Sequence, residues 1–173
     1  MPSPYDYRDY FREEDDTRQY WGDEAAGCIF VAKETGRILL AHRSDRVGYE
    51  PDTWGTWGGK VDPGETPKDA VAREVEEETG FAGSYKINPL YVYRDGDFKY
   101  HNYLVIVPHE FTPQLNWEND TSAWVEFGDW PEPLHFGMVE LLRHSGDKIK
   151  QVVDLTKAKK KDSLLEAMDT PPP

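Results

Sequence analysis

The sequence predicts an α/β fold in which a mixed sheet lies between helices. Short apolar stretches typical of strands lie on both sides of one helix near the middle of the chain, and a second helix is expected near its end. Such elements bury their apolar faces best as one sheet covered by helices. With 173 residues, the chain is long enough for one domain with a substantial core.

The first half of the chain predicts a strand hairpin followed by the central helix. The apolar run Ala25–Lys33 indicates a buried strand, residues 34–36 form a turn, and Arg37–Arg43 is a second strand. After a polar loop, Thr66 is the expected N-cap of a helix that runs to about Thr79. A proline occupies the first helical position and a glycine follows the last, which is typical of helix ends.

The second half predicts three strands, a loop and a helix. In chain order these are strands over Tyr85–Arg94 and Phe98–Pro108, a loop over Phe111–Thr121, a strand over Ser122–Phe127 and a helix over Leu134–His144. Gly146 is expected to end this last helix, because glycine favours helix C-termini.

Three segments follow from this pattern. Residues 1–23 are an N-terminal extension, 24–146 form the domain, and 147–173 are a C-terminal tail with helical character. The tail carries a basic run at 157–161, which could serve a membrane or a partner. A solvated helix that packs one apolar edge is the preferred interpretation. The apolar residues of the tail are Leu164, Leu165 and Met168.

The composition excludes several classes of protein. A net charge of −13 disfavours broad binding to nucleic-acid backbones, which requires a basic face. The single cysteine, Cys28, rules out an internal disulfide and has the apolar neighbours of a core residue. Because the sequence has neither a membrane-length apolar run nor a signal-peptide pattern, a cytoplasmic protein without a membrane partner is expected.

The central helix gathers carboxylates on one face. On a helical wheel, Glu74, Glu77 and Glu78 lie within an arc of about 100° beside an apolar face formed by Val71 and Val75. Like charges one turn apart destabilise a helix unless a cation lies among them. Hard oxygen ligands favour Mg²⁺, Mn²⁺ or Ca²⁺. The alternative is an ordinary solvated acidic face.

The residues around this helix resemble the signature of the Nudix hydrolases over about residues 24–145. Two positions depart from the pattern: Phe81 replaces a more usual aliphatic residue, and Trp57 stands where proline is frequent. The resemblance implies an α/β/α sandwich with the mixed sheet in its centre. The matching residues are Gly59, Glu65, Arg73, Glu74, Glu77, Glu78 and Gly80.

This resemblance also implies a reaction. Water attacks a phosphorus atom of a nucleoside diphosphate linked to a group X, assisted by Mg²⁺ ions that Mn²⁺ can replace. Glu74, Glu77, Glu78 and the carbonyl of Gly59 are the implied metal ligands. Arg73 is expected to hold a carboxylate of the cluster. Glu65, expected near the substrate, would orient a water or support the loop.

The general base stays open between two glutamates. Glu77 is one candidate, and Glu118, six residues before a tryptophan, resembles an additional metal-binding glutamate of family members that act on oxidised nucleotides. Asp120 and Glu110 are weaker alternatives.

Contacts to the substrate are expected from Arg43, which the resemblance places at the phosphates, and from His135, in the loop before the last helix. The other histidines lack zinc-ligand spacing and are interpreted as structural. Several aromatic residues could stack on a base or belong to the core. They are Trp54, Trp57, Tyr103, Trp124 and Phe136.

The preferred substrate is a (deoxy)nucleoside triphosphate, in ordinary or oxidised form, by elimination of other family signatures. ADP-ribose and a dinucleoside polyphosphate follow, and capped RNA is disfavoured by the acidic composition. A non-catalytic nucleotide sensor is the main alternative to an enzyme, although the glutamates of the signature are all present. An isomerase would need a cysteine at the pocket, which Cys28 does not fit. A monomer or a homodimer is expected.

Overall fold

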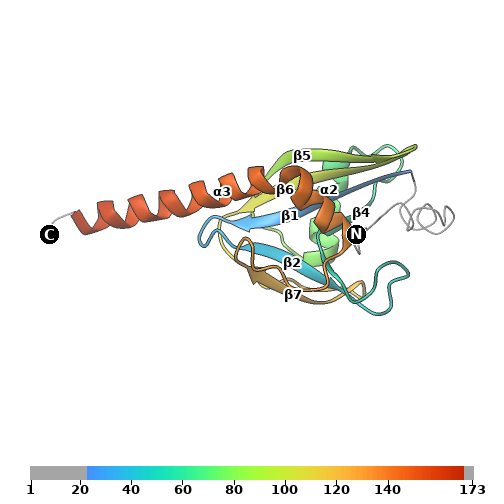
Figure 1. Ribbon diagram of the computed structural model, residues 1–173, viewed down its shortest axis with the longest axis horizontal. Helices are drawn as coiled ribbons and strands as arrows, with labels where there is room; N and C mark the ends of the chain where they lie inside the picture. The colour runs from blue at the N-terminus through green and yellow to red at the C-terminus, as the bar shows by residue number, and fades with distance from the viewer. Residues whose placement is uncertain (1–22, 170–173) are drawn as a thin grey trace, which may run out of the picture.

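The structure is a computed structural model that describes residues 23–169. Within this range it contains a sheet and two helices (Figure 1). The strands are β1 (Glu24–Ala32), β2 (Ile38–Arg43), β3 (Trp54–Gly55), β4 (Trp57–Lys60), β5 (Lys86–Asp95), β6 (Phe98–Val107) and β7 (Asn119–Val125). The helices are α2 (Pro67–Thr79) and α3 (Phe136–Asp169).

The sheet is mixed, as predicted. Its order is β3-β2-β1-β6-β5, with β4 paired to β1 and β7 paired to β2. Strands β1 and β6 run parallel over their whole lengths, and the other pairs are antiparallel. The predicted hairpin of β1 and β2 is confirmed, with Gly36 in the left-handed conformation (φ 70°) at its turn.

Each face of the sheet carries one helix, which gives the α/β/α sandwich expected from the resemblance. Helix α2 places Val71 and Val75 against one face, where they pack with Phe30 and Trp57. Helix α3 places its apolar residues on the opposite face. Since successive residues of β1 and β2 point to alternate faces, both strands contribute to both cores and are almost wholly buried. Cys28 belongs to the α2 side and is buried, as predicted.

The sequence missed two short strands and misplaced the start of a third. Strands β3 and β4 lie at the end of the polar loop expected over Ser44–Trp54 and in the glycine-containing segment after it, and both strands are too short to show a period. Strand β7 begins at Asn119, within the expected loop, because it pairs with β2 around a bulge between His42 and Arg43. That bulge aligns Arg43 with Asn119 and brings two polar side chains to the edge of the sheet.

The expectation that Gly146 ends the last helix is wrong. Helix α3 starts at Phe136 and continues through Gly146 to Asp169. A glycine inside a helix costs about 1 kcal/mol relative to alanine. Burial of Ile149 and Val153 in the same core as Met138 offsets this cost, so the helix continues beyond the expected boundary of the domain.

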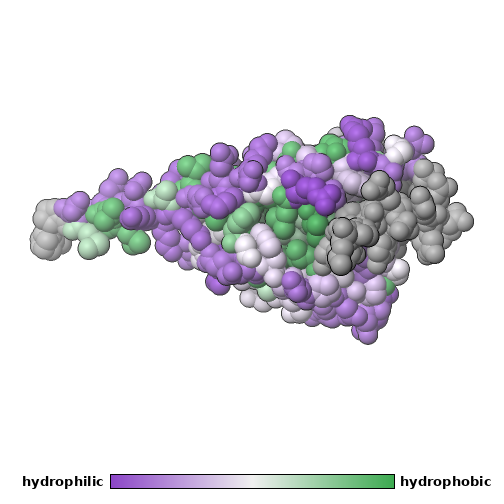
Figure 2. Space-filling view, viewed as in Figure 1, coloured by the Kyte–Doolittle hydropathy of each residue, from purple (hydrophilic) through white to green (hydrophobic). Residues whose placement is uncertain are grey.

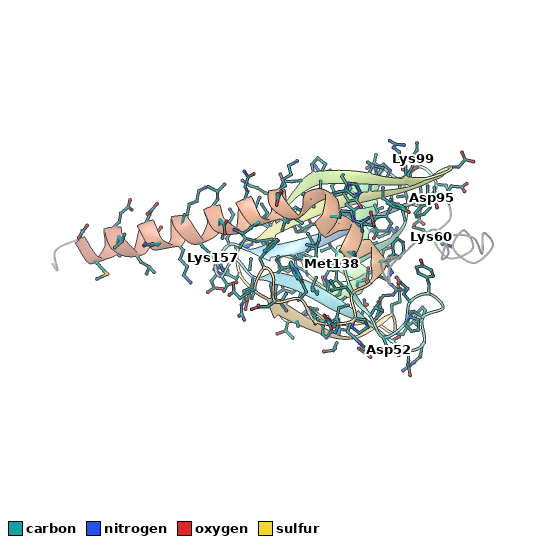
Figure 3. The ribbon with its side chains drawn as sticks, viewed as in Figure 1. Asp52, Lys60, Asp95, Lys99, Met138 and Lys157 are labelled. Carbon is teal, nitrogen blue, oxygen red and sulfur yellow. The ribbon has the colours of Figure 1, made fainter. Side chains whose placement is uncertain are left out.

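The apolar edge predicted for the tail does not pack on the domain. Leu164, Leu165 and Met168 are exposed, and the C-terminal end of α3 extends beyond the sheet (Figures 1 and 3). Lys157, which lies 2.5 Å from Glu126 through its Nζ atom, marks where α3 leaves the sheet. Within residues 23–169, α3 included, no helix combines the length and the apolar character needed to cross a membrane.

Candidate active site

The caps of α2 fix the direction in which its glutamates point. Thr66 Oγ1 accepts a hydrogen bond from the backbone N–H of Asp69 at 3.1 Å, and Pro67 begins the helix. At the other end, Gly80 is left-handed (φ 68°) and its N–H donates to the carbonyl of Glu76. Both predicted caps are confirmed, and the acidic face lies in the C-terminal part of the helix between them.

Two of the three clustered glutamates are buried. Glu78 is 3% exposed and accepts hydrogen bonds from the N–H of Gly58 at 2.6 Å and from Asn119 Nδ2 at 2.8 Å. Glu74 is 8% exposed, whereas the side chain of Glu77 is 55% exposed. Asn119 was not predicted as a site residue from the sequence, although it directly follows Glu118, which was.

Burial and mutual repulsion keep these carboxyls from ionising easily. Burial raises the pKa of Glu74 to about 7, with Glu77 and Glu118 adding to the rise and Arg73 opposing it. Burial likewise raises the pKa of Glu78 to about 8, helped by the charges of Glu74 and Glu118. A cation placed among these oxygens would reverse the effect, because it stabilises the ionised form.

Arg73 ties the helix to the preceding loop. Its Nε and Nη2 atoms donate to the two oxygens of Glu65, both at 3.0 Å, and Nη2 also donates to the carbonyl of Lys60 at 2.8 Å. The Nη1 atom donates to Glu74 at 2.9 Å and to Glu77 at 3.1 Å. Glu65 Oε1 accepts a further bond from the N–H of residue 62. Of its two expected roles, support of the loop fits this geometry.

Glycine is required where the loop crosses the acidic cluster. A Cβ atom on Gly59 would overlap the carboxylate of Glu74, so a larger residue would displace the glutamate. Gly58 is held between β1 and Tyr100, where a Cβ would overlap the backbone. The loop backbone can therefore come close to the helix face that the resemblance assigns to a metal.

Glu118 is brought to the same place by the loop before β7. Its carbonyl accepts from the N–H of Ser44 at 2.8 Å, and its own N–H donates to Asn116 Oδ1 at 2.9 Å. Burial raises the pKa of Glu118, Arg43 lowers it, and Glu77 raises it further. These influences place the Glu118 carboxyl within electrostatic reach of the α2 glutamates. The weaker alternative Glu110 instead pairs with Arg37 at 2.6 Å.

Arg43 and His135 lie together beside this cluster. Arg43 Nη2 donates to the carbonyl of Tyr49 at 2.7 Å, which fixes the buried guanidinium. His135 Nδ1 accepts from the N–H of Gly137 at 2.9 Å, and its Nε2 lies 3.0 Å from Glu50 Oε2. Burial lowers the pKa of His135 and the Glu50 carboxylate opposes this. Both residues line one pocket, and their role as substrate contacts stays a prediction.

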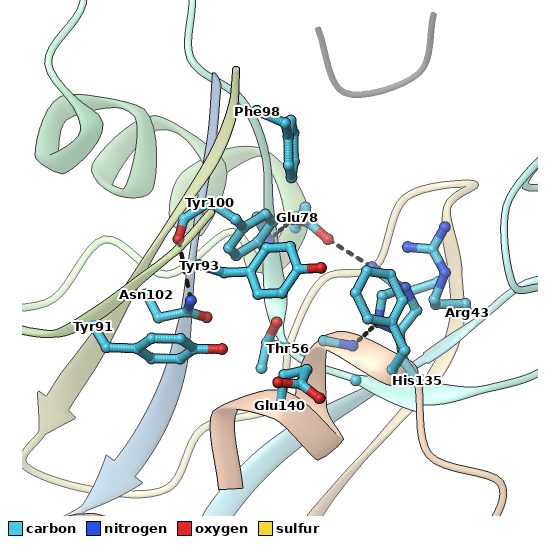
Figure 4. A pocket seen from close by; sticks show the side chains of 15 residues that line it. Arg43, Thr56, Glu78, Tyr91, Tyr93, Phe98, Tyr100, Asn102, His135 and Glu140 are labelled. Atoms are coloured by element: carbon cyan, nitrogen blue, oxygen red, sulfur yellow. Dashed lines mark hydrogen bonds between the residues drawn. The ribbon is translucent and has the colours of Figure 1, made fainter. Parts of the chain in front are cut away.

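That pocket encloses about 690 Å³ of empty space, part of which is open to solvent. It runs from Glu78 and Arg43 to Glu140 on α3 (Figure 4). Aromatic residues from β5, β6 and α3 form its apolar walls. They are Tyr91, Tyr93, Phe98, Tyr100 and Phe136.

Only one of the aromatic residues named from the sequence, Phe136, lines this pocket. Trp57 is fully buried in the α2 core, and Tyr103 and Trp124 pack against the same core. Tyr91 and Tyr93 were missed because strand periodicity says which residues share a face, but not which face meets the pocket. Their neighbour Glu140, only 6% exposed, was equally absent from the expected site residues.

The site's donor set fits a divalent ion. Glu74, Glu77, Glu78 and Glu118 offer carboxylate oxygens, which Mg²⁺ and Mn²⁺ prefer, and glycine at 59 leaves room for a backbone carbonyl to join them. A second group lies elsewhere: one ligand atom each from His42, Asp52 and Asp120 lie within 4.8 Å of one another. His42 Nδ1 is 2.6 Å from Asp120 Oδ1, so these residues also satisfy each other.

The raised pKa values give a prediction for stability. Without metal, the free energy of unfolding should fall by several kcal/mol from about pH 5 to about pH 8. Folded Glu74 and Glu78, with pKa values of about 7 and about 8, still hold protons where unfolded carboxyls near 4.5 have lost them. The folded state therefore binds more protons, and stability declines as the pH rises.

Urea unfolding in EDTA at the two pH values measures this fall. Glu78→Gln, which cannot ionise, should flatten the dependence, and Mg²⁺ should restore stability at about pH 8 by binding the folded state. Equal stability of the wild-type protein at both pH values would contradict the assignment.

Comparison with known proteins agrees with this geometry. A solved structure, the MutT NUDIX hydrolase from Burkholderia pseudomallei, superposes with a TM-score of 0.55 at 28% identity, covering 70% of this chain and 97% of that one. The dihydroneopterin triphosphate diphosphatase of Haemophilus influenzae is 27% identical over 125 residues, 62% of this chain and 76% of that protein. The nucleoside triphosphatase NudI of Escherichia fergusonii is 44% identical over 53 residues, 31% of this chain and 37% of that protein.

Curated relatives of this kind are matched over about a third to three quarters of their lengths, so their activities do not transfer to the chain by similarity alone. A family model described as NUDIX domain matches residues 23–145, most of the part in which the sheet, α2 and the pocket lie. Because it covers most of the chain, this match shows that the chain belongs to the Nudix hydrolase family.

Proposed function

We propose that this enzyme hydrolyses a (deoxy)nucleoside triphosphate in a Mg²⁺-dependent reaction. The observation that carries the proposal is a continuous pocket that joins Glu78, one of the buried glutamates of α2, to an aromatic-walled cavity. The acidic end suits a polyphosphate neutralised by metal, and the aromatic end suits a base. NudI and the dihydroneopterin triphosphate diphosphatase, both named for triphosphate substrates, support this class.

The residues around the pocket would have separate roles in metal binding, phosphate binding and proton transfer. Glu74, Glu77, Glu78, Glu118 and the Gly59 carbonyl would hold Mg²⁺ or Mn²⁺, which when bound lowers the repulsion between a polyphosphate and an attacking water. Arg43, fixed by the Tyr49 carbonyl, supplies positive charge to the phosphates. Arg73 holds Glu74 and Glu77 in position. Glu118 and Glu77 are the carboxylates available to accept the proton of the attacking water.

The far end of the pocket favours a particular base edge. Glu140 carries a buried carboxylate there, held by Arg143 Nη1 at 3.1 Å and facing the two β5 tyrosines. Its charge contributes to raising the pKa of Tyr93 to about 12, after burial and Asp95. A carboxylate only accepts hydrogen bonds, so it selects a ring with adjacent N–H donors. Guanine has such an edge, 8-oxoguanine keeps it, and adenine places an acceptor beside its amino group.

We therefore expect a guanine triphosphate to be preferred over an adenine triphosphate by about 10–100-fold in kcat/KM, the discrimination of a good paired contact. Glu140→Gln should reduce this preference to a few-fold, because the amide can also donate to adenine. Steady-state kinetics with dGTP and dATP measure it. Asp147→Asn also removes one negative charge from α3, but at an exposed position. It should keep the wild-type ratio of kcat/KM for dGTP to kcat/KM for dATP. An unchanged ratio in Glu140→Gln would exclude this role.

Phosphate or pyrophosphate release from a nucleotide panel tests the proposal as a whole. The panel includes ordinary and oxidised triphosphates, ADP-ribose and dinucleoside polyphosphates, with Mg²⁺ or EDTA. Turnover of triphosphates that EDTA abolishes is the expected result. Preferred turnover of ADP-ribose or a dinucleoside polyphosphate would show that the substrate is not a nucleoside triphosphate. Tight binding without turnover, or full activity of Glu77→Gln on every substrate, would contradict the mechanism.

A further inference from the structure

The C-terminal end of α3 is a helix without a covering surface among the described residues. Every residue from 158 to 169 is exposed, and this projecting end, residues 158–169, has a length of about 18 Å. It carries hydrophobic side chains among charged ones (Figure 2). Among residues 23–169, the large hydrophobic side chains that are exposed are Trp117, Leu155 just before the projecting end, and three within it, which are Leu164, Leu165 and Met168.

Four apolar residues of this stretch are grouped on one side of the helix, and Leu164 lies about 40° outside their arc. With 3.6 residues per turn, Leu155, Ala158, Leu165 and Met168 fall within an arc of about 140°. An isolated helix of this length is only marginally stable in water, and its stability usually comes from packing an apolar face. Met168 is nonetheless 81% exposed and Leu155 is 62% exposed. The face is therefore suited to a partner helix.

The charges of the same segment identify the partner as a second copy of the chain. Residues 157–161 contain four lysines, and residues 162–169 contain the acidic residues Asp162, Glu166 and Asp169. Two such helices side by side attract each other only when antiparallel, since the basic half of one then lies along the acidic half of the other. A parallel pair would place lysine against lysine.

We propose that the projecting ends of two copies pair as antiparallel helices. When Lys161 of one copy faces Asp162 of the other, Leu155 faces Met168 and Ala158 faces Leu165. Lys161 and Asp162 lie within the arc of the apolar face, and in this arrangement they form the intermolecular pair that sets the register. In this register the tip of each helix reaches the place where the other α3 leaves its sheet, so both projecting ends are covered over their full length. The proposal does not depend on the substrate of the active site.

Sedimentation velocity of the full chain tests the pairing across about 5–500 μM, because so short an interface lies at the weak end of specific contacts. Dimers that grow with concentration are expected. Lys161→Glu should raise the dimer dissociation constant by about tenfold, because two attractions become repulsions. The double variant Lys161→Glu/Asp162→Lys exchanges the charges and should restore the wild-type constant. All these residues are exposed, so circular dichroism should show an unchanged fold.

A covalent measurement follows the same register. In an Ala158→Cys/Leu165→Cys protein, mild oxidation should join two copies, since two helical positions seven residues apart are too distant for a disulfide within one chain. The native Cys28 is buried and does not interfere. A monomer at every concentration, or a dimer that Lys161→Glu leaves unchanged, would overturn the proposal. Binding to anionic vesicles by a protein that stays monomeric would assign the face to a membrane instead and overturn it as well.

Discussion

Replacing Glu78 by glutamine should lower kcat by about a thousandfold, the scale expected for loss of a charged catalytic group. Glu78 lies at the junction of α2, the glycine loop and β7, where Gly58 and Asn119 hold its two oxygens. Glutamine keeps the shape of the side chain but removes the charge that would hold a divalent ion. The glutamine oxygen can still accept from Gly58, and Asn119 can turn its amide oxygen toward the glutamine NH2, so both contacts persist without a buried charge. The folded protein should therefore be at least as stable as the wild type at about pH 8.

Metal dependence and a matched variant make this result specific. The remaining activity of Glu78→Gln should require more Mg²⁺, which a titration of kcat against Mg²⁺ concentration measures. Glu76→Gln changes the same type of residue on the same helix, but its side chain is exposed, so activity should stay within about twofold of the wild type. Equal losses in both variants would indicate a general effect of helix charge rather than a metal ligand.

Replacing Arg73 by lysine should cost about 2 kcal/mol of stability and lower kcat by about 10–100-fold. The guanidinium contacts Glu65, Glu74, Glu77 and the Lys60 carbonyl at once, which a single ammonium group cannot do. The Arg73 side chain is 27% exposed, so the expected loss of stability is smaller than for breaking a fully buried charge pair. Since Arg73 touches two expected metal ligands, part of the lost activity should return at high Mg²⁺ concentration.

Urea unfolding and an Mg²⁺ titration of kcat measure both effects. Arg94→Lys, on the exposed end of β5, makes the same exchange away from the site and should change neither quantity. Unchanged stability together with unchanged Mg²⁺ dependence in Arg73→Lys would show that the contacts seen around the guanidinium do not hold the cluster.

Local pattern determined helix α2 and its chemistry. Thr66, Pro67 and Gly80 mark the ends of this helix through neighbours a few residues away, so their caps could be predicted from the sequence. The same short range places Glu74 and Glu78 on one face, and the long spacing from Gly59 to Gly80 indicates the Nudix family.

Contacts between distant segments decided the rest of the site, and no local pattern encodes them. Asn119 reaches Glu78 only because β7 pairs with β2 around a bulge. Tyr93 and Glu140 meet because the sheet and α3 form one pocket. Helix α3 continues through Gly146 because burial of Ile149 in the core stabilises the helix. Helix propensity alone does not include this burial free energy. The sequence alone therefore determined helix α2 and the family of the chain, whereas only the tertiary structure decided which side chains line the pocket beside that helix.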